Sequence, residues 1–543
     1  MPIISTAHGG LRRAARPMTE QGSSPDTRYC YLFPELAAAE AKRFPDARAA
    51  ERHFNDLNRL SIIMDAKAGG LKKSGLPAIY TYFGQFLNHD ISAPFGAPTP
   101  VTDVTLNPTP DVIDNTPDLG GIITPQRPRD PAWIVDNILN EHPAPMTLDS
   151  LYGSGPFGGS PDIMDLYDSA APVFRLSTTI REGRLGHLTA NEPAVVRTPG
   201  PDLRRDPAIR EALIADRRND ENLVIAQLHL AFLLFHNKVV AALQPGIGDR
   251  QKLFAKARRL VTRHYQWCVV HDYLAHIAPG AADKVRGLVI RENEVPFEFT
   301  SAAFRFGHSM VGANYDYNEN FRTGGLLGPA SLQSLVEFTS RNNMGGSADP
   351  LKQLPDHWVI EWERFLRANP ADVNSRADSI DTVIARHMTN LPTPDPMIQL
   401  RLSSISNRNL KRGFHRFIAS GQKLSEALGV EILSPEAICD AFGGGSTATE
   451  LRRLGFDRET PAWAYFLCEG RIRNQGNLPG PAASAIVAET IVGLLRRDPD
   501  SVLNAKGKDG REAWKPADSP LRTPAGAQID SIRTFLQYAG VVA

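Results

Sequence analysis

The stretch 222–243, NLVIAQLHLAFLLFHNKVVAAL, constrains the fold more than any other part of this chain. Its length suits a helix, and its apolar residues would lie on almost every side of that helix rather than on one face. A helix of this kind is stable in water only when other elements cover most of its surface. The chain is therefore expected to build a large core around it.

Glycine and proline indicate how the remaining elements are connected. The 543 residues include 43 glycines and 42 prolines, and prolines recur every few residues from 91 to 131. Proline lacks a backbone donor and has a fixed φ, so this stretch is predicted to be neither a helix nor a central strand. A loop of this length in a compact protein often carries function or covers a site.

Composition excludes several classes of protein. Lys and Arg total 60 and so do Asp and Glu, which argues against a protein that grips nucleic acid, because binding phosphates needs a basic excess. No run of 18 apolar residues occurs, so no membrane span is predicted, and the first twenty residues lack a signal-peptide core. We expect a cytoplasmic protein or one secreted without a classical signal. The four cysteines, without CxxC spacing, are predicted to be buried thiols: Cys30, Cys268, Cys439 and Cys468.

Helical patterns dominate the chain, and the fold class is predicted to be mainly α and loop-rich, with very little β structure. Residues 1–75 form an expected N-terminal arm with one charged helix over about 34–60, packed on a single domain of residues 76–543. The only clear strand pattern is 285–293. Beyond 222–243, helices are predicted at 77–90, 251–277, 300–313, 329–340, 354–368, 376–389, 408–428, 434–441, 461–469 and 480–497.

Two polar groups stand before or within apolar helices in the first half of the chain. In YFGQFLNHD, Gln85 and His89 are four residues apart and share one helix face. In ADRRNDENL at 215–223, N-capping by Asp220 explains the acidic residues. It does not explain Arg217 and Arg218, because charges at the start of a buried helix are costly unless they pair or face a site.

Two further groups follow in the second half. In FRFGHSM, Arg305 comes three residues before His308. In SNRNLKRGFHR, Asn409 and Arg412 are again three residues apart. Each of the four groups is a weak signal alone, and a single buried histidine is more often a structural residue. Their order along the chain is the informative feature.

This order of motifs resembles the animal-type haem peroxidases of the peroxidase–cyclooxygenase superfamily, over residues from about 75 to 500. It looks closest to the bacterial members, through RNDENLVIAQLHLAFLLFHN at 218–237 and LDSLYGSGP at 148–156. TPAWAYFL at 460–467 and LPGPAASAIVAETIVGLL at 478–495 add to the likeness. The resemblance implies that residues 76–543 form one helical haem-peroxidase catalytic domain.

The resemblance also implies a role for each motif residue. His89 is expected to be the distal catalytic base over the haem, with Gln85 beside it and Arg218 as the distal arginine. On the other side of the haem, His308 is expected to bind iron. Asn409 is expected to accept its second ring N–H, and Arg305 and Arg412 to bind the propionates. These residue types suit peroxide chemistry, because a neutral imidazole can move a proton between the two oxygens while a guanidinium stabilises developing negative charge.

Departures from the family pattern bear on covalent links and on calcium. Asn88 cannot form the ester that an aspartate forms at that position, whereas Glu221 can, and Asn222 replaces a methionine that makes a sulfonium link. The resemblance thus implies haem b with at most one ester, through Glu221. It also implies a calcium ion, for which Asp90, Thr147 and Asp149 could supply hard oxygen ligands before Tyr152, although Pro143 and Pro145 disturb the spacing.

The implied function is a haem peroxidase that reduces hydrogen peroxide and oxidises a halide, thiocyanate or a small aromatic donor. The first alternative is a haem-dependent fatty-acid dioxygenase or tailoring oxidase of the same superfamily. Such dioxygenases use a tyrosine three residues before the proximal histidine, where this chain has Arg305. The second alternative is a non-enzymatic adhesion module. The physiological donor and the oligomeric state have no readable signal in the sequence.

Overall fold

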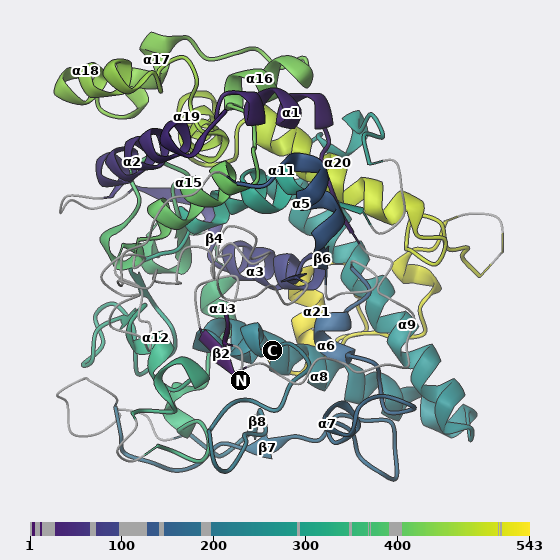
Figure 1. Cartoon of the computed structure of the whole chain (residues 1–543). Helices are drawn as coiled ribbons and strands as arrows, with labels where there is room; N and C mark the ends of the chain where they lie inside the picture. The colour runs from purple at the N-terminus through teal and green to yellow at the C-terminus, as the bar shows by residue number, and fades with distance from the viewer. Residues whose placement is uncertain are drawn as a thin grey trace.

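The computed structural model describes most of the chain and leaves a few segments out. The described residues are 28–65, 72–96, 128–140, 146–185, 197–289, 294–346, 350–367, 369, 371–389, 404–508, 510 and 513–543, with the backbone alone at 3–5, 11–13, 94–96, 137 and 139. Helices predominate, as predicted, and strands are short (Figure 1). Most of the predicted proline-rich loop, residues 97–127, lies outside the described residues.

Helix α8 (Leu223–Leu243) is the central buried helix that the sequence predicts. It packs against α3 (Ile79–Ile91), α9 (Arg250–Cys268) and α21 (Ile532–Ala539). Aromatic rings join these helices: Phe232 stacks on Phe86 with 4.3 Å between centroids, and Phe235 stacks on Phe535 at 4.0 Å. By length and composition the segment Leu223–Gly246 could cross a membrane. However, 83% of its most apolar window is buried inside the protein, as in the core helix of a globular domain.

The other helices surround this centre. In the view of Figure 1, α3 lies near the middle of the molecule, with α15 above it and α8 below it. The longer helices are α1 (Pro34–Lys42), α2 (Ala47–Met64), α5 (Pro131–Asn137), α15 (Ile405–His415), α16 (Gly421–Ala427), α17 (Pro435–Ala441), α18 (Gly445–Leu454), α19 (Ala462–Asn474) and α20 (Pro481–Arg497). Single turns are α6 (Asp149–Tyr152), α7 (Pro161–Met164), α10 (Leu274–Ile277), α11 (Phe297–Ser301), α12 (Ser334–Glu337) and α13 (Trp362–Phe365).

Strands serve mainly to fasten distant segments together. The largest sheet has the order β5 (Pro94–Gly96), β6 (Ile138–Asn140), β3 (Arg28–Cys30), β9 (Glu294–Pro296), and β3 and β9 are parallel. The remaining strands pair as β1 (Ile3–Ser5) with β2 (Leu11–Arg13), β4 (Lys73–Pro77) with β12 (Arg376–Asp378), β7 (Ser177–Thr178) with β8 (Pro201–Asp202), and β10 (Asn314–Tyr315) with β11 (Ala330–Ser331).

The arm contains two helices where one was predicted. Pro45 interrupts the pattern, and the side chain of Asp46 then caps α2 by accepting a hydrogen bond from the Ala49 backbone N–H at 2.8 Å. The arm lies on the rest of the protein: α2 packs against α15, and the Tyr31 hydroxyl donates to the Arg416 carbonyl at 2.8 Å. The division of the chain at residue 75 stays a prediction.

Several predicted helices are shorter or absent. The segment 408–428 is two helices, because Phe417 has a φ of 47° and ends the first. The segment 376–389 is not one helix: it begins with β12, which pairs with β4, and Asp378 binds Lys73 at 2.5 Å; its helical part is the 3-10 turn η10 (Arg386–Met388). The predicted strand 285–293 is also wrong where it is described, because residues 285–289 have no regular structure.

Three predicted helices near the proximal motif break into short pieces. The segment 300–313 contains α11 and the 3-10 helix η6 (Ala303–His308); 329–340 retains only α12; 354–368 contains the 3-10 turn η8 (Asp356–Trp358) and α13. By contrast, 251–277 is helical throughout, because the π-helical turn η4 (Val269–Tyr273) joins α9 to α10. Helices α18 and α21 have no counterpart among the predicted elements.

Candidate functional site

Helix α3 presents Gln85 and His89 as the sequence predicts. Nearly all of this helix is buried, and Gln85 and Asn88 are the two residues of it that retain partial exposure. His89 is fully buried, and its Nδ1 lies 2.8 Å from the amide oxygen of Asn219. Asn219 belongs to the 3-10 turn η2 (Arg217–Asp220), which packs against α3 just before α8 begins.

Asn219 connects His89 to a second buried histidine. Its amide nitrogen lies 3.1 Å from Nδ1 of His229, a residue of α8. Burial lowers the pKa of His229 to about 3, so this imidazole is neutral and its Nδ1 can accept from the amide. The amide oxygen then accepts from His89, which places the His89 proton on Nδ1 and makes Nε2 the basic nitrogen. Asn219 and His229 were not among the predicted site residues.

Arg218 is buried, and its guanidinium holds the end of α3. Nη2 donates to the His89 carbonyl and Nη1 to the Ser92 carbonyl, both at 2.7 Å, while the Asp216 carboxylate accepts from Nε and Nη2. Carbonyls at a helix C-terminus lack intrahelical donors and carry partial negative charge, so a cation here stabilises the helix end. Arg218 therefore fixes the backbone of His89 itself.

The remaining predicted residues on this side lie at the start of α8. Glu221 is buried, and its carboxylate lies 3.4 Å from Nη2 of Arg341. Asn222 caps α8 by accepting from the Ile225 N–H at 3.0 Å, and its amide nitrogen donates to Gln85 at 3.3 Å. Residues from α3 and from the start of α8 therefore form one polar group at the centre of an apolar core.

The predicted proximal residues also lie together. Nδ1 of His308, at the end of η6, is 2.8 Å from the side-chain amide nitrogen of Asn409 on α15. The Asn409 amide oxygen accepts from Nη1 of Arg305 at 3.3 Å, and Nε of Arg305 donates to the Thr300 carbonyl at 2.6 Å. The sequence motifs thus meet across a separation of 101 residues between His308 and Asn409.

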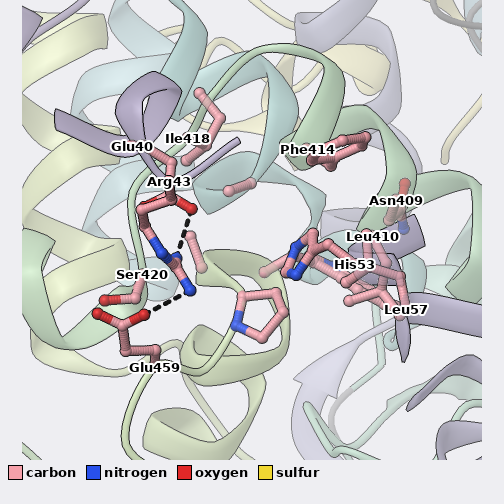
Figure 2. A pocket seen from close by; sticks show the side chains of 15 residues that line it. Glu40, Arg43, His53, Leu57, Asn409, Leu410, Phe414, Ile418, Ser420 and Glu459 are labelled. Atoms are coloured by element: carbon pink, nitrogen blue, oxygen red, sulfur yellow. Dashed lines mark hydrogen bonds and ion pairs between the residues drawn. The ribbon is translucent and has the colours of Figure 1, made fainter. Parts of the chain in front are cut away.

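Neighbouring residues hold this pair in place. The indole N–H of Trp463 donates to the Arg305 carbonyl at 3.0 Å, and Arg412 is buried one turn beyond Asn409 on α15. A small cavity of about 30 Å³ adjoins Asn409, enough for about one water molecule. Figure 2 shows its wall, where Arg43 bridges Glu40 and Glu459.

The two groups are connected through α3. The helix contacts η2, α8 and η6, and the Thr81 hydroxyl donates to the Met310 carbonyl at 3.4 Å, two residues beyond His308. Unlike their buried neighbours, Gln85, Asn88, Arg305, Gly307 and His308 all keep partial exposure. A Cβ at Gly307 would meet no atom within 4 Å. Open space beside an amide-bound imidazole, with arginines nearby, fits a haem.

The predicted calcium ligands fit their ion less well. Asp90 is fully buried at the end of α3, and its carboxylate accepts from Ser150 Oγ at 3.0 Å. Asp149 forms an ion pair with Arg258 at 2.6 Å, and the Thr147 carbonyl accepts from the same guanidinium at 3.3 Å. Within the described residues there is no cluster of three or more His, Cys, Asp or Glu side chains that could hold a metal ion.

Comparison with known proteins relates part of the chain to one family. Residues 162–349 match the sequence model of the animal haem peroxidase family. Peroxinectin A from Dictyostelium discoideum is 32% identical over 108 residues, which are 19% of this chain and 20% of that protein. Peroxidase mlt-7 from Caenorhabditis elegans is 26% identical over 186 residues, which are 32% of this chain and 23% of that protein. The matched segments thus span less than a quarter of either relative.

Solved structures share the fold over most of the chain. Peroxidase A from Dictyostelium discoideum superposes with a TM-score of 0.53 and 17% identity, over 88% of this chain and 90% of that one. The fatty acid alpha-dioxygenase of Arabidopsis thaliana gives a TM-score of 0.50 and 12% identity, over 88% and 72%. The expected closeness to bacterial members stays a prediction, since these relatives are eukaryotic. Residues 162–349 thus match the animal haem peroxidase family, and most of the chain shares the fold of Peroxidase A.

Proposed function

We propose that the chain is a haem-dependent peroxidase, which reduces hydrogen peroxide and oxidises a small donor such as a halide, thiocyanate or an aromatic compound. One observation carries the proposal: the Nδ1 atoms of two histidines each lie 2.8 Å from an asparagine side chain. One histidine, His89, belongs to α3, and the other, His308, belongs to η6, which contacts α3. Asparagine in this position selects the tautomer of each imidazole. Bound haem would supply the iron and the redox chemistry.

His89 is proposed to move the proton. With Nδ1 committed to Asn219, Nε2 can take the proton from one peroxide oxygen and return it to the other as the bond between them breaks. Such a shuttle requires a neutral imidazole with a fixed tautomer. The buried amide provides this fixation without adding a charge that would favour the protonated form.

His308 is proposed to hold the iron, with Asn409 as its positioning residue. An imidazole that gives Nε2 to a metal carries its proton on Nδ1 and needs an acceptor there. The Asn409 oxygen can take that role when the amide is rotated by 180° from its present orientation, in which the oxygen accepts from Arg305. The rotation would release the Arg305 guanidinium, which suits the proposed contact of Arg305 with a propionate.

The amide of Asn219 offers a test of the distal assignment. We expect Asn219→Leu to slow the reaction with peroxide by about 10–100-fold, the scale for losing a partner that orients a reactive group. Asn219→Asp keeps an acceptor for Nδ1 but adds a charge that stabilises the protonated imidazole. The acid limb of its pH–rate profile should therefore move to higher pH.

Leu and Asp are both close to Asn in size, but only Asp keeps an acceptor for Nδ1 of His89 and adds a charge, so a shift of the pH–rate profile confined to Asn219→Asp separates control of the imidazole from a merely structural role. Stopped-flow measurement of the haem absorption after mixing with peroxide, from pH 4 to 9, separates the two cases. Equal rates and unshifted profiles in both variants would show that Asn219 does not govern His89.

The activity itself is tested against the dioxygenase alternative. The full chain, loaded with haem, is given either peroxide with a phenolic donor, bromide or thiocyanate, or linoleate with oxygen. We expect peroxide-dependent oxidation of a donor and no oxygen uptake with linoleate, because Arg305 stands where the dioxygenases of the superfamily have a tyrosine. Failure to oxidise any donor in the haem-loaded protein would contradict the proposed function.

The proposal includes at most one covalent bond between haem and protein, an ester through Glu221. The Glu221 carboxylate is paired with Arg341 at 3.4 Å, and Asn222 is committed to capping α8 and to Gln85. An ester would require the carboxylate to leave Arg341. The distal side of the chain thus favours a haem held mainly by non-covalent contacts.

A further inference from the structure

The loop before α6 connects the distal helix to α9 through two sets of contacts. On one side it meets Asp90, the residue directly after His89. On the other it meets Arg258 and Gln266, both on α9; the Gln266 amide nitrogen donates to the Met146 carbonyl at 3.0 Å. This is the place where the family resemblance implies a calcium ion, and its contacts decide whether this chain can use one.

Hydrogen-bond donors already engage the Asp90 carboxylate. Its Oδ2 accepts from the Leu148 N–H at 3.2 Å, and its Oδ1 accepts from Ser150, from the backbone N–H at 3.3 Å and from the hydroxyl at 3.0 Å. The loop achieves this by placing Leu148 in the left-handed region, with φ 62°. The backbone is therefore shaped to point N–H groups at Asp90, and N–H groups repel a cation.

The guanidinium of Arg258 is the positive charge that contacts this loop. Its Nη2 donates to Asp149 Oδ1 at 2.6 Å and to the Thr147 carbonyl at 3.3 Å. The guanidinium also lies over the Tyr152 ring, 5.0 Å from the ring centroid. The exposed fractions of the two charged side chains are 27% for Arg258 and 10% for Asp149, so the pair is only partly screened by water.

Among the residues that the structure describes here, these contacts leave no ligand set of the kind that calcium requires. Calcium takes 6–8 oxygen ligands. Here Arg258 binds the Asp149 carboxylate and the Thr147 carbonyl. Hydrogen-bond donors surround the Asp90 carboxylate. A guanidinium satisfies carboxylate and carbonyl oxygens with charge and direction together.

We propose that Arg258 is the built-in cation of this site: it takes the place of calcium, fastens the loop before α6 to α9, and through Asp90 steadies the end of the distal helix. The described part of this loop then needs no divalent metal to hold its shape. This inference concerns the architecture of the protein and does not depend on the proposed peroxidase activity.

The first test is calcium itself, applied to the full chain in its haem-loaded and haem-free forms. We expect neither EDTA nor millimolar CaCl₂ to change the melting temperature, and isothermal titration with CaCl₂ to give no binding heat. A lower melting temperature in EDTA, or a calcium-induced rise, would overturn the proposal.

The second test removes the guanidinium. Arg258→Ala should lower the melting temperature by about 1–2 °C, because a loss of about 1 kcal/mol shifts the melting temperature of a chain of 543 residues by about 1 °C. Arg259→Ala is the matched control, because Arg259 is the next residue of α9 and is exposed; it should stay within about 0.5 °C of the parent.

A double-mutant cycle keeps the test informative if Arg258→Ala folds poorly. Asp149→Asn retains the size of the side chain but removes its charge, and Arg258→Lys retains the charge but not the fork geometry. In the Asp149→Asn background, Arg258→Lys should cost less stability than in the parent, because the partner charge is already gone. Equal costs in both backgrounds, or an Arg258→Ala variant as stable as Arg259→Ala, would contradict the assignment.

Discussion

His308→Ala should lose haem binding almost entirely. The variant removes the imidazole whose Nδ1 lies 2.8 Å from the Asn409 side-chain nitrogen and which is proposed to bind the iron. Residues that only orient a metal ligand typically change the metal affinity by about 10–100-fold. Removal of the ligand itself is expected to lower haem affinity by more than that. Titration of the haem-free chain with haem, followed by absorption in the Soret region, measures the change.

Two controls make this result specific. Imidazole added to His308→Ala should restore part of the Soret band, because the vacated position can accept a free ligand. His271→Ala should bind haem normally, since His271 lies exposed on the π-helical turn and stacks on Trp267 at 3.9 Å between centroids. Unchanged haem affinity and spectra in His308→Ala would refute the proximal assignment.

The order of motifs along the sequence predicts much of the site. Gln85, His89 and His308 each occur in a short motif with apolar neighbours, and Arg218 stands in a charged segment directly before the most apolar helix, so sequence patterning marks them as polar groups within a core. The structure places them on α3, η2 and η6, and α3 contacts both of the other elements. The central helix 222–243 is predictable for the same reason, since a segment that is apolar on all sides has few alternatives to burial.

Other site residues are not predictable from patterns of this kind. Asn219 stands between two charged residues in RRNDEN, where capping of the following helix is a sufficient explanation for polar side chains. His229 lies within the most apolar helix and reads as a structural histidine. Only the packing of α3 on α8 and η2 reveals that one amide links the two imidazoles.

Arg258 and the segment 376–389 show the second limit of sequence patterns. Arg258 is 109 residues from Asp149, and charged residues are frequent on a helix such as α9, so nothing local marks the pair. The segment 376–389 has a helical pattern but begins with strand β12, because β4 offers a strand partner and Lys73 offers a counter-ion for Asp378. In both places a distant partner decides the structure.

Arg218→Ala should slow the reaction with peroxide by about 10²–10³-fold, the scale for loss of one charge-stabilising donor. It should also destabilise the fold, because Asp216 loses its ion-pair partner and two carbonyls at the end of α3 lose their donor. Breaking a buried ion pair on one side typically costs about 3–5 kcal/mol. Arg217→Ala is the matched control: Arg217 is the preceding residue, pairs with Glu211 and is 39% exposed, so its rate and stability should change little.

The variant Asp216→Asn distinguishes two ways in which Arg218 could act. If Arg218 acts on peroxide directly, loosening its contact with Asp216 leaves the guanidinium charge in place and the rate largely intact. If Arg218 acts by holding the carbonyls of His89 and Ser92, as its contacts favour, Asp216→Asn should slow the reaction as well, because the guanidinium loses its anchor. Stopped-flow rates for the three variants, each with its haem content measured, decide between the two. A normal rate in Arg218→Ala together with a slow Arg217→Ala would transfer the role to Arg217.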